Sequence, residues 1–485
     1  MRLSAMQLDR AVGAILASAA GDALGSRYEF GPALPDSLTP EFGVGCFGHD
    51  VGEWTDDTSM ALPILMQLAE GHTLDDPHAL ARILADWREW ARTAKDVGTQ
   101  TRGVLSHLDD DATEDAARAV SENAHRRTGR SGGNGSLMRT GPVALGYLDR
   151  SPADLAAAAG RVAQLTHWEP DNVDACALWC LAIRHAVLTG ELDIRGQLAW
   201  VPADRRARWA EIIDEATAPG IHPRDFTPGN GWVVRAFQGA LAAISGAVSL
   251  RDALERAVRG GGDTDTVAAI AGSLAGAIWG GSALPLSFRR RLHGWPGVDA
   301  NELTRLAVLA ARHGRSDGEG WPMADRATVY AGSDHLFPHP HDEDVWIGSL
   351  AALDRLPDEV DAVVSLCRIG RAQMPADAES IQVWLVDQPD RNANLDRVLA
   401  DAADMVAELR REGKRVFLHC AEGRSRTSAV AALYGARHRG IPLDQAWDDV
   451  RRTLPGFAPQ QFLREAVARL AQRGAATRGS ARITP

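Results

Sequence analysis

The chain has 485 residues, of which 45% are hydrophobic and 24% are charged. These proportions are those of ordinary globular proteins, and they exclude a disordered or a fibrous chain. Because a single hydrophobic core does not grow efficiently to this size, we expect two or three domains. The 64 aspartates and glutamates outnumber the 52 lysines and arginines, and the resulting net charge of −12 argues against non-specific binding to nucleic acid or to an anionic membrane.

Cysteine usage and hydropathy bear on the compartment. The five cysteines are odd in number and lack the spacing of a zinc site, so we expect no disulfide framework. No apolar run reaches the length of a membrane span. Residues 11–20 imitate a short signal-peptide core, but Asp9 and Arg10 break that pattern. We therefore expect a cytoplasmic protein that does not bind membranes.

Residues from about 8 to 310 are predicted to be helical throughout. Apolar residues recur every three to four positions in long segments, which are 11–24, 59–71, 77–93, 172–190 and 266–280. Alternating valine and isoleucine, which would indicate strands, is nearly absent. The loops between these segments are rich in glycine, aspartate and threonine. We therefore expect an all-α domain that displays its functional groups on loops.

Two acidic clusters precede helices in this domain, at residues 54–58 and 261–266. Aspartate at a helix N-terminus is also an ordinary N-cap, so neither cluster is decisive alone. Together they offer four carboxylates and two hydroxyls without histidine or cysteine, a set of donors that suits Mg²⁺ or Mn²⁺ rather than zinc. Since crowded carboxylates repel one another, a cation would account for their grouping.

The segments WTDDTSM and GGDTDTVAAIAGSLAGA resemble the two hallmark segments of the ADP-ribosylglycohydrolase family. Further segments match the family in order, and these are GDALG at 21–25 followed by Glu29, DVGTQT at 96–101, GGNGSLMR at 132–139 and Thr166-His167. The resemblance spans about residues 8–310. It implies a hydrolase that removes ADP-ribose from a modified protein, nucleic acid or small molecule, with two divalent cations, Mg²⁺ or Mn²⁺, at the distal ribose.

The resemblance also implies roles for individual residues. The implied metal ligands are Thr55, Asp56, Asp57, Asp263, Asp265 and Thr266. The residues implied in ADP-ribose binding are Gly98, Thr101, Gly133, Asn134, Gly135, Ser136 and His167. Glu29 would lie on a mobile loop near the scissile bond and orient the substrate or transfer a proton. Alternatives remain open, because Glu29 also fits an exposed loop residue, His167 a hydrogen-bonded core residue, and the glycine loop a plain turn.

The character of the sequence changes at residues 313–325, where glycine, aspartate and a proline predict a linker between domains at 1–312 and 326–474. Short β-like runs follow at 327–332, 344–349, 361–367, 381–387 and 414–420. Helical stretches separate several of these runs, so we expect an α/β domain with a largely parallel sheet. The small and polar residues 475–485 are predicted to form a disordered tail.

The last β-like run leads into HCAEGRSRT, residues 419–427, and a helix follows. In such a loop, backbone N–H groups point at a bound phosphate, and the helix N-terminus adds a positive field. The same field favours a thiolate at Cys420, which can attack phosphorus, while Arg426 can bind two phosphoryl oxygens and Thr427 can bond the sulfur. The loop residues expected around the phosphate are Ala421, Glu422, Gly423, Arg424 and Ser425.

This loop resembles the HC-x5-R-[ST] signature of the protein tyrosine and dual-specificity phosphatase superfamily, and the resemblance covers about residues 325–470. The family needs an aspartate roughly thirty residues before the nucleophile, which protonates the leaving oxygen. Asp387 and Asp390 are both candidates. Asp387 is preferred because it directly ends a predicted strand.

The sequence therefore predicts a bifunctional hydrolase with an ADP-ribosyl hydrolase domain and a phosphatase domain that acts on a phosphorylated substrate. In one alternative, one of the domains is a non-catalytic reader of ADP-ribose or phosphate that regulates the other. In another, the phosphatase acts on a phosphorylated ADP-ribose derivative. All the expected reactive residues are present in both halves, which favours turnover in both.

Overall fold

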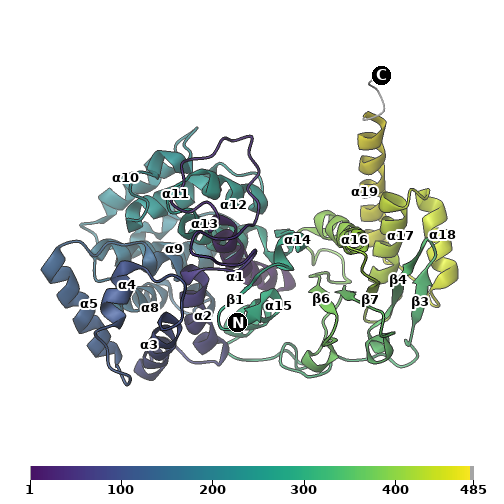
Figure 1. Cartoon of the computed structure of the whole chain (residues 1–485), viewed down its shortest axis with the longest axis horizontal. Coiled ribbons are helices and arrows are strands. Elements are labelled where there is room, and N and C mark those ends of the chain that lie inside the picture. Colours follow the sequence, from purple (N-terminus) through teal and green to yellow (C-terminus); the bar gives the residue numbers. More distant parts are fainter. Residues whose placement is uncertain (1, 481–485) are drawn as a thin grey trace. The chain divides into compact units, whose positions relative to one another are not determined.

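The computed structural model describes residues 2–480, and the chain divides into two compact units. The first unit comprises residues 1–284 and 288–315, and the second comprises residues 285–287 and 316–485. In Figure 1 the helices of the first unit run from purple to teal, and the elements of the second run from green to yellow. The division after Arg315 falls inside the predicted linker.

The first unit is built of helices, as predicted (Figure 1). Its α-helices are α1 (Ala5–Gly25), α2 (Asp56–Ala69), α3 (Pro77–Ala91), α4 (Thr99–Leu105), α5 (Glu114–Thr128), α6 (Gly135–Met138), α7 (Gly141–Gly146), α8 (Pro152–Gln164), α9 (Pro170–Thr189), α10 (Arg206–Ala216), α11 (Val233–Ser245), α12 (Leu250–Arg259), α13 (Thr264–Trp279) and α15 (Ala300–Ala310). Shorter elements are the 3-10 turns η1 (Arg195–Trp200), η2 (Pro223–Phe226) and η3 (Gly281–Ala283), and the antiparallel pair β1 (His293–Gly294) and β2 (Val298–Asp299). The short helix α14 (Leu286–Arg289) contains residues of both units.

Helices α1 and α13 lie side by side within the first unit (Figure 1). A Cβ atom added at Gly21 would lie 2.2 Å from the carbonyl oxygen of Ala268, and one added at Gly25 would lie 2.4 Å from Cα of Asp265. Since no larger residue fits at either glycine, the two backbones can approach closely. This approach brings Asp22 on α1 next to the N-terminus of α13, where the second acidic cluster lies.

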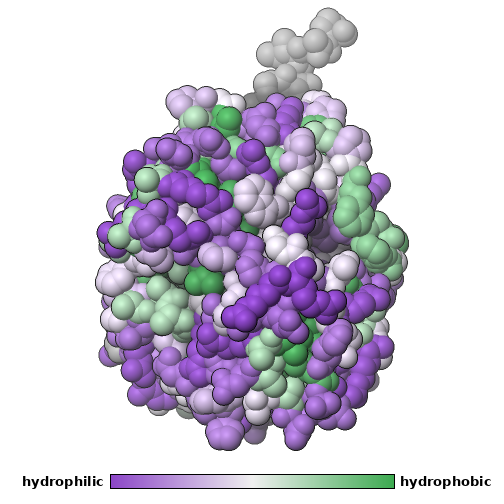
Figure 2. Space-filling model, turned by 90° about the vertical axis from the view of Figure 1, so that its left-hand side faces the viewer, coloured by the Kyte–Doolittle hydropathy of each residue, from purple (hydrophilic) through white to green (hydrophobic). Residues whose placement is uncertain are grey.

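One face of the molecule is mainly polar. Figure 2 shows that hydrophilic residues predominate on this face and that hydrophobic residues form small, separate patches. Within residues 2–480, none of the helices combines the length and the apolar character that crossing a bilayer requires. The apolar side chains of the predicted helical segments are instead buried against one another, for example Leu16, Leu80 and Leu274.

The second unit contains a five-stranded mixed sheet with helices, which agrees with the predicted α/β fold. Its strands are β3 (Leu336–His339), β4 (Asp342–Ser349), β5 (Ala362–Ser365), β6 (Glu379–Gln382) and β7 (Val416–Cys420), in the order β3-β4-β7-β5-β6. Strands β3 and β4 pair antiparallel, and the other pairs are parallel. The remaining elements are η4 (Leu350–Arg355), η5 (Arg371–Gln373), α16 (Leu395–Arg411), α17 (Arg426–His438), α18 (Leu443–Thr453) and α19 (Gln461–Ser480).

Strand β7 occupies the middle of this sheet, between β4 and β5, and all five of its residues are buried. In the register of the sheet, Cys420 pairs with Ser349 at the end of β4. The carboxyl ends of parallel strands open toward the loops that precede helices, and this edge is where α/β folds place their ligands. The end of β7 therefore delivers Cys420 to a ligand-binding edge.

Two of the strand predictions need correction. Residues 327–332 form no strand, because the first strand of the unit, β3, begins at Leu336. Val329 and Tyr330 are exposed rather than packed in the sheet. The strand predicted at 381–387 is also shorter, since β6 ends at Gln382. A run of strand-forming residues becomes a strand only where a neighbouring strand offers hydrogen bonds and packing, which local sequence does not show.

The predicted linker at 313–325 is packed in its second half. The rings of Trp321 and Trp384 lie with centroids 6.2 Å apart, and the guanidinium carbon of Arg368 lies 4.2 Å from the Trp321 ring centroid. The second unit therefore begins about ten residues earlier than predicted, at Ser316. Hydrophobic and cation–π contacts from one tryptophan outweigh the flexible composition of the segment around it.

The C-terminal boundary also differs from the prediction. Helix α19 continues to Ser480, so the first residues of the tail predicted at 475–485 are helical. Residues 481–485 lie outside the part of the chain that the structure describes. The composition of this segment, which predicted disorder, does not prevent a helix from extending out of a packed first turn.

Candidate active sites

A cluster of buried carboxylates lies where three helices of the first unit meet. Asp22 of α1, Asp57 of α2 and Asp265 of α13 each place an oxygen within 4.8 Å of the others. Oγ1 of Thr55 lies among them, 2.8 Å from Asp22 Oδ1, 3.2 Å from Asp57 Oδ2 and 3.5 Å from Asp265 Oδ2. Oγ1 of Thr266 lies 3.4 Å from Asp57 Oδ2. The two acidic segments, which are far apart in the sequence, thus converge on one point.

Asp22 is a member of this cluster that sequence analysis did not single out. Its Oδ1 accepts hydrogen bonds from the backbone N–H (2.9 Å) and the hydroxyl (2.8 Å) of Thr55. Its Oδ2 accepts from the backbone N–H (3.0 Å) and the hydroxyl (2.6 Å) of Thr58. These bonds fix the first turn of α2 to α1. The signal was available, because a carboxylate inside an apolar helix must find partners when it is buried.

The electrostatics of the cluster favour a bound cation. Burial raises the pKa of Asp57 well above its usual value, and the charges of Asp22 and Asp56 raise it further. The pKa of Asp265 is raised by burial and then by Asp57. Oδ1 of Asp57 is buried and has no hydrogen-bond partner among the residues that the structure describes. These oxygen donors fit a hard divalent cation, which would satisfy the unpartnered oxygen and offset the repulsion.

A second group of carboxylates adjoins the first through Asp265. Glu29, Asp263 and Asp265 place oxygens within 4.8 Å of one another. The side-chain amide of Asn134 donates a hydrogen bond to Asp263 Oδ2 at 2.7 Å. Since Asn134 belongs to the glycine loop, this contact joins that loop to the acidic cluster. The loop and the cluster, which are far apart in sequence, therefore form one site.

Glu29 has the chemistry of a proton-transfer group. Burial raises the pKa of Glu29 to about 7, while a hydrogen bond from Cys46 lowers it and the charges of Asp263 and Asp96 raise it. The thiol of Cys46 donates that bond to Oε2 of Glu29 at 3.0 Å. A carboxyl group whose pKa lies near neutrality can both donate and accept a proton at working pH. Sequence analysis had singled out neither Cys46 nor Asp96 as a site residue.

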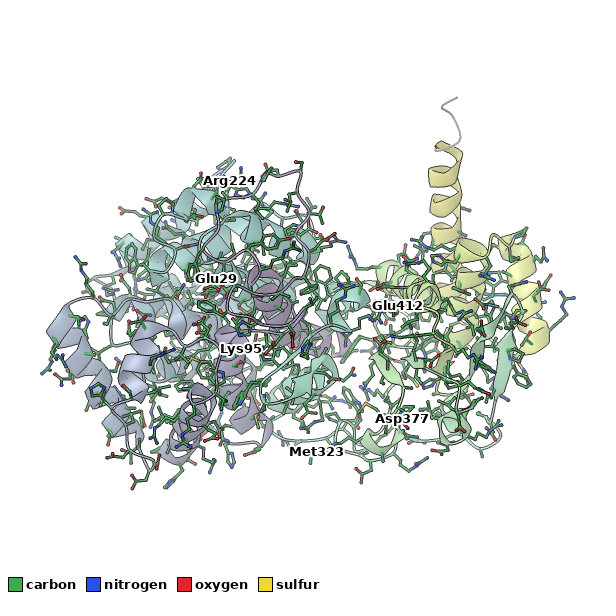
Figure 3. The ribbon with its side chains drawn as sticks, in the orientation of Figure 1. Glu29, Lys95, Arg224, Met323, Asp377 and Glu412 are labelled. Atoms are coloured by element: carbon green, nitrogen blue, oxygen red, sulfur yellow. The ribbon has the colours of Figure 1, made fainter. Side chains whose placement is uncertain are left out.

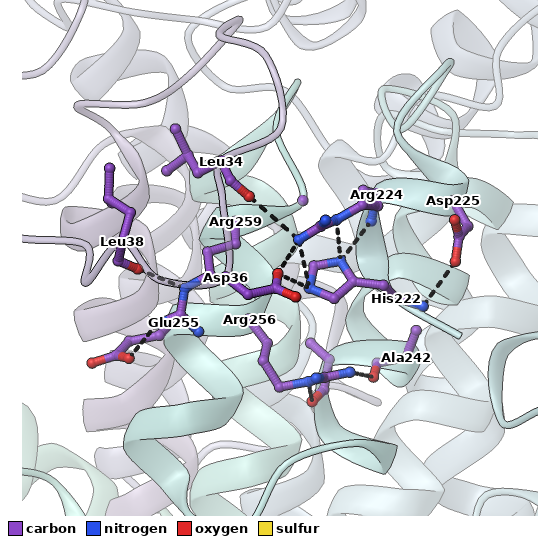
Figure 4. Close-up of polar contacts among 12 residues, drawn as sticks. Leu34, Asp36, Leu38, His222, Arg224, Asp225, Ala242, Glu255, Arg256 and Arg259 are labelled. Atoms are coloured by element: carbon purple, nitrogen blue, oxygen red, sulfur yellow. Dashed lines mark hydrogen bonds and ion pairs between the residues drawn. The ribbon is translucent and has the colours of Figure 1, made fainter. Parts of the chain in front are cut away.

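Two arginines anchor the loop that joins α1 to α2 and carries this glutamate (Figure 4). Nη2 of Arg224 donates to the carbonyl of Leu34 at 3.3 Å and pairs with the carboxylate of Asp36. Nε of Arg259 donates to the carbonyl of Leu38 at 2.7 Å. These contacts hold the loop, which the resemblance implied to be mobile, against η2 and α12.

Helix α9 stabilises the glycine loop at residues 132–136 through a hydrogen bond. The side-chain amide of Asn172 donates a hydrogen bond to the carbonyl of Gly133 at 2.7 Å. His167 is buried, and a Cβ atom added at Gly133 or Gly135 would lie 3.3 or 3.2 Å from its Nε2. His167 is therefore a buried, hydrogen-bonded residue that also faces the loop, so the two interpretations of it are compatible.

Gly98 and Thr101 connect the glycine loop with the acidic cluster. Gly98 is the N-cap of α4, and Thr101 is buried in the first turn of that helix. A Cβ atom added at Gly98 would lie 3.9 Å from Asp56 Oδ2, and one added at Gly135 would lie 3.6 Å from Thr101 Oγ1. The residues implied in ADP-ribose binding thus lie next to one another and border the implied metal ligands.

Asp56 belongs to neither carboxylate group, and together with Thr55 it lines an adjoining cavity of about 800 Å³. Burial raises the pKa of Asp56 well above its usual value, and Asp96 is its strongest charged neighbour. The walls include the aromatic and acidic residues Trp54, Trp90, Trp295, Asp50, Glu53, Asp56, Asp96, Asp299 and Glu302. Lys95, labelled in Figure 3, also lines the cavity, and its Nζ pairs with Glu53 at 2.6 Å. The cavity thus combines tryptophan rings with an excess of negative charge.

In the second unit, the loop after β7 encloses a cavity of about 350 Å³. Its walls include the predicted residues Cys420, Ala421, Glu422, Arg424, Ser425 and Arg426. Nη1 of Arg426 donates to the carbonyls of Leu366 (2.8 Å) and Leu385 (3.1 Å), which fixes the guanidinium in place. Its buried Nε has no hydrogen-bond partner within residues 2–480. Because Arg426 and Cys420 line the same cavity, this N–H is suited to donate to a phosphoryl oxygen.

Other residues of the signature shape the loop rather than line it. Gly423 adopts φ +72°, and an added Cβ atom would lie 2.9 Å from the carbonyl of Gly348. The hydroxyl of Thr427 donates to that same carbonyl at 3.2 Å, which differs from the expected bond to sulfur. His419 is buried, its Nε2 lies 2.8 Å from Ser365 Oγ, and burial lowers its pKa to about 3. A neutral His419 therefore links β7 to β5 through a side-chain hydrogen bond.

Of the two candidate acids, the structure brings Asp387 to the loop. Its Oδ1 accepts a hydrogen bond from the hydroxyl of Ser425 at 2.8 Å, and its Oδ2 lies 3.6 Å from Arg426 Nε. Asp390 is exposed, has φ +58° and is absent from the described cavity wall. The reason given for preferring Asp387 was nevertheless wrong, because the strand before it ends five residues earlier, at Gln382.

Tyr330, Ala458 and Gln460 complete the wall of this cavity, and sequence analysis missed all three. The backbone N–H of Gln460 donates to Ser425 Oγ at 3.2 Å, so the loop before α19 helps to hold the phosphate loop. Tyr330 lies in the segment that had been predicted as a strand. The signature carried no signal for these residues, because it is local and they are distant from it in the sequence.

The geometry of the first unit agrees with comparison to known proteins. The family model described as ADP-ribosylglycohydrolase matches residues 3–319, which is more than half of the chain. The chain belongs to the ADP-ribosylglycohydrolase family. It is similar to ADP-ribosylarginine hydrolase Tri1 of Pseudomonas putida (strain GB-1), with 32% identity over 284 residues that cover 57% of this chain and 72% of the relative. It is also similar to ADP-ribosyl-[dinitrogen reductase] glycohydrolase of Rhodospirillum rubrum, with 31% identity over 299 residues that cover 59% and 90%.

The second unit matches a different family model. Residues 358–469 match the model described as dual specificity phosphatase, catalytic domain. Among solved structures, human DUSP28 is 20% identical and aligns with a TM-score of 0.27 over 30% of this chain and 98% of that chain. Both matched families are hydrolases. The two resemblances stated from sequence are thus confirmed, and this member of the ADP-ribosylglycohydrolase family carries a phosphatase-family domain at its C-terminal end.

Proposed function

We propose that the first domain uses divalent cations to hydrolyse the glycosidic bond between ADP-ribose and a modified target. The observation that carries this proposal is the buried group of Asp22, Asp57 and Asp265, in which Asp57 Oδ1 has no hydrogen-bond partner in the described structure. Carboxylates crowded in this way either hold protons, as their raised pKa values indicate for the metal-free protein, or bind a cation that allows them to ionise. The order of the family motifs and the shared identity with two named ADP-ribosyl hydrolases support the same function.

The proposed ligands are the residues that the resemblance implied, with Asp22 at their side. Thr55, Asp56, Asp57, Asp263, Asp265 and Thr266 would hold two ions of Mg²⁺ or Mn²⁺. When bound, the ions would supply the positive charge that polarises the hydroxyls of the distal ribose and lowers the pKa of water. The carboxylates next to the ribose stabilise the positive charge that develops on the sugar as the glycosidic bond lengthens.

The remaining roles fall to residues around the cluster. The backbone of the glycine loop at 132–136 would bind the diphosphate through its N–H groups. In the reaction, an oxygen of water bonds to the anomeric carbon, the bond to the target breaks, and the leaving atom takes up a proton. Glu29, with a pKa of about 7, is suited to remove the proton from water and to return it to the leaving group.

We propose further that the linkage cleaved is to arginine. The similar protein from Pseudomonas putida is named an ADP-ribosylarginine hydrolase. The cavity beside Asp56 presents the partly exposed ring of Trp295 and an excess of carboxylates, which are the groups that a planar guanidinium prefers. A linkage to serine or to a nucleic-acid base would bring no positive charge to this cavity. Net negative charge in the cavity therefore favours an arginine-bearing protein target over nucleic acid.

For the second domain we propose hydrolysis of a phosphomonoester with Cys420 as nucleophile. The observation that carries it is the cavity that Cys420 and Arg426 line together, where Nε of Arg426 makes no hydrogen bond in the described structure and lies 3.6 Å from Asp387 Oδ2. The thiolate attacks phosphorus, and the bond to the leaving oxygen breaks as Asp387 gives that oxygen a proton. Water then displaces the sulfur from the phosphocysteine, and Asp387 takes the proton that water loses. Phosphate leaves, and both residues return to their starting state.

A panel of substrates tests the first activity. The intact chain is given peptides with ADP-ribose linked to arginine or to serine, and ADP-ribosylated nucleic acid, with Mg²⁺ or Mn²⁺, and ADP-ribose release is measured. We expect release from the arginine-linked peptide and loss of release in Asp57→Asn. Tight binding of ADP-ribose without release from any substrate would instead support the alternative of a reader domain. Release from the serine-linked peptide alone would refute the arginine linkage and keep the metal-dependent hydrolase.

A comparison of two phosphoesters tests the second activity. Phosphate release is measured from a phosphotyrosine peptide and from ADP-ribose 1-phosphate, with Cys420→Ser as the inactive control. We expect release from the peptide that Cys420→Ser abolishes. Faster release from ADP-ribose 1-phosphate would support the alternative in which the second domain processes a phosphorylated ADP-ribose derivative. Release that survives Cys420→Ser would refute cysteine catalysis.

A further inference from the structure

Arg139 is a buried cation behind the glycine loop. Its side chain is 0% exposed, and its guanidinium carbon lies 4.1 Å from the centroid of the Trp87 ring. Nη2 donates a hydrogen bond to Thr166 Oγ1 at 2.7 Å, and Nη1 contacts Met60 Sδ at 3.8 Å. None of its hydrogen bonds in the described structure goes to a carboxylate. Burying a guanidinium without a carboxylate partner costs free energy. Its shortest hydrogen bond is the one to Thr166.

Arg139, Thr166 and His167 form a chain of hydrogen bonds, here called the relay, and the bond from Arg139 to Thr166 sets its direction. A guanidinium only donates hydrogen bonds, so Thr166 Oγ1 accepts from Arg139 and keeps its own proton for another partner. Its second neighbour is Nδ1 of His167, at 2.7 Å. Among residues 2–480 the structure shows no third partner for this hydroxyl. Within the described residues, Nδ1 is therefore the one acceptor within reach of the hydroxyl proton, so the hydroxyl donates to Nδ1.

This direction determines where His167 carries its proton. A neutral imidazole whose Nδ1 accepts a hydrogen bond is protonated at Nε2. A doubly protonated ring would point a second N–H at Thr166 and would place a positive charge near Arg139. Burial, and then the charge of Arg139, lower the pKa of His167 well below its usual value. At neutral pH the ring is therefore uncharged, with its proton on Nε2.

The protonated nitrogen faces the glycine loop. An added Cβ atom would lie 3.3 Å from His167 Nε2 at Gly133 and 3.2 Å from it at Gly135, so side chains at either position would block the ring. The backbone around Thr166 is also fixed, because Gln100 Nε2 donates to its carbonyl at 3.0 Å. The last donor of the relay is thus the Nε2–H of His167, which lies next to the glycine backbone of the loop.

We infer that Arg139 and Thr166 are positioning residues that hold His167 as a neutral Nε2–H donor, which hydrogen-bonds a diphosphate oxygen of ADP-ribose on the glycine loop. This inference rests on the proposed function, in which that loop binds the diphosphate. A neutral donor gives a directed bond that is weaker than a charged one, which allows ADP-ribose to leave after hydrolysis. Arg139 thus acts on the tautomer through Thr166, and its charge helps to keep the ring of His167 neutral.

The tautomer can be measured without any ligand. The full-length protein is labelled with ¹⁵N-histidine, and long-range ¹⁵N–¹H correlation spectra distinguish protonation at Nε2 from protonation at Nδ1. His167→Gln identifies the signal by removing it. We expect the wild-type ring to be neutral with its proton on Nε2. A proton on Nδ1, or on both nitrogens at neutral pH, would overturn the inference.

Substitutions at Thr166 test the link to binding. Thr166→Val keeps the shape of the side chain and removes the hydroxyl, whereas Thr166→Ser keeps the hydroxyl as a matched control. We expect Thr166→Val to lose the preference for Nε2 and to bind ADP-ribose roughly tenfold more weakly in calorimetry, as expected for one neutral hydrogen bond. Thr166→Ser should retain both properties. Arg139→Met offers a second variant with the same expected loss.

The outcomes separate this inference from the proposed function. If the tautomer changes in Thr166→Val but ADP-ribose binds with unchanged affinity, the donor has no role in binding and the inference is overturned, while the hydrolase stands. If the wild-type protein neither binds ADP-ribose nor releases it from any peptide, the proposed function fails as well. A weaker affinity in Thr166→Val that Thr166→Ser restores supports the complete relay.

Discussion

Replacing Asp57 by asparagine should have opposite effects on the metal-free and the metal-loaded protein. In the metal-free protein, Asp57 has a buried oxygen without a partner in the described structure, and its charge raises the pKa of Asp265. Asparagine removes that charge, so we expect Asp57→Asn to melt at or above the temperature of the wild type. In the loaded protein the same change removes a cation ligand. The stabilisation that the wild type gains from the metal should then be lost.

The size of the metal effect follows from mass action. A ligand at about one hundred times its dissociation constant stabilises the folded state by about 2.7 kcal/mol. For a domain of this size, 1 kcal/mol corresponds to roughly 2 °C in melting temperature, so the wild-type transition should rise by about 5 °C. Scanning calorimetry with Mg²⁺ or Mn²⁺ and with chelator measures this shift. Asp111→Asn, at an exposed position outside the cluster, is the matched control and should shift like the wild type.

The stability of the metal-free protein should depend on pH in a defined direction. The folded pKa values of Asp57 and Asp265 are raised above the unfolded value of 3.8. Above pH 3.8 the folded metal-free protein therefore holds more protons than the unfolded chain, and its stability from these groups falls as pH rises. The melting temperature of metal-free Asp57→Asn minus that of the wild type should thus grow with pH. A constant difference, or a variant that metal stabilises like the wild type, would refute the reasoning.

Three further predictions follow from the sites. Asp387→Asn should slow phosphate release from an alkyl phosphate by about 100-fold or more and affect release from an activated aryl phosphate less. Asp390→Asn should change neither rate. If Asp390→Asn shows the larger effect instead, the roles of the two aspartates are exchanged. Chelation by EDTA should stop ADP-ribosyl hydrolysis and leave phosphatase activity unchanged. Cys420→Ser should stop phosphatase activity and leave ADP-ribosyl hydrolysis unchanged. Loss of both activities from either change would show that the two sites depend on each other. Arg224→Gln should speed amide hydrogen exchange in the loop between α1 and α2 and lower ADP-ribosyl turnover severalfold; unchanged exchange would show that the loop needs no anchor there.

Much of this protein could be predicted from local sequence. Apolar residues at helical spacing predicted the long helices, because one face of each helix must be buried wherever it packs. The segment from His419 to Thr427 predicted the loop after β7, since this loop consists of a strand end, a turn and a helix N-terminus that are contiguous in sequence. The acidic segments before α2 and α13 favoured Mg²⁺ or Mn²⁺ over zinc because they offer only oxygen donors, and the structure brings them together.

Only the tertiary structure decided which distant residues join these sites. Asp22 enters the acidic cluster because Gly21 and Gly25 let α1 approach α13, and neither glycine is marked by the motif around Asp265. Asp387 reaches the phosphate loop along an irregular segment after β6, and Tyr330 lines the same cavity from a segment that strand propensity misassigned. Local sequence determines backbone preference, whereas burial, the raised pKa values and the composition of each cavity depend on side chains from other elements, which only packing brings together.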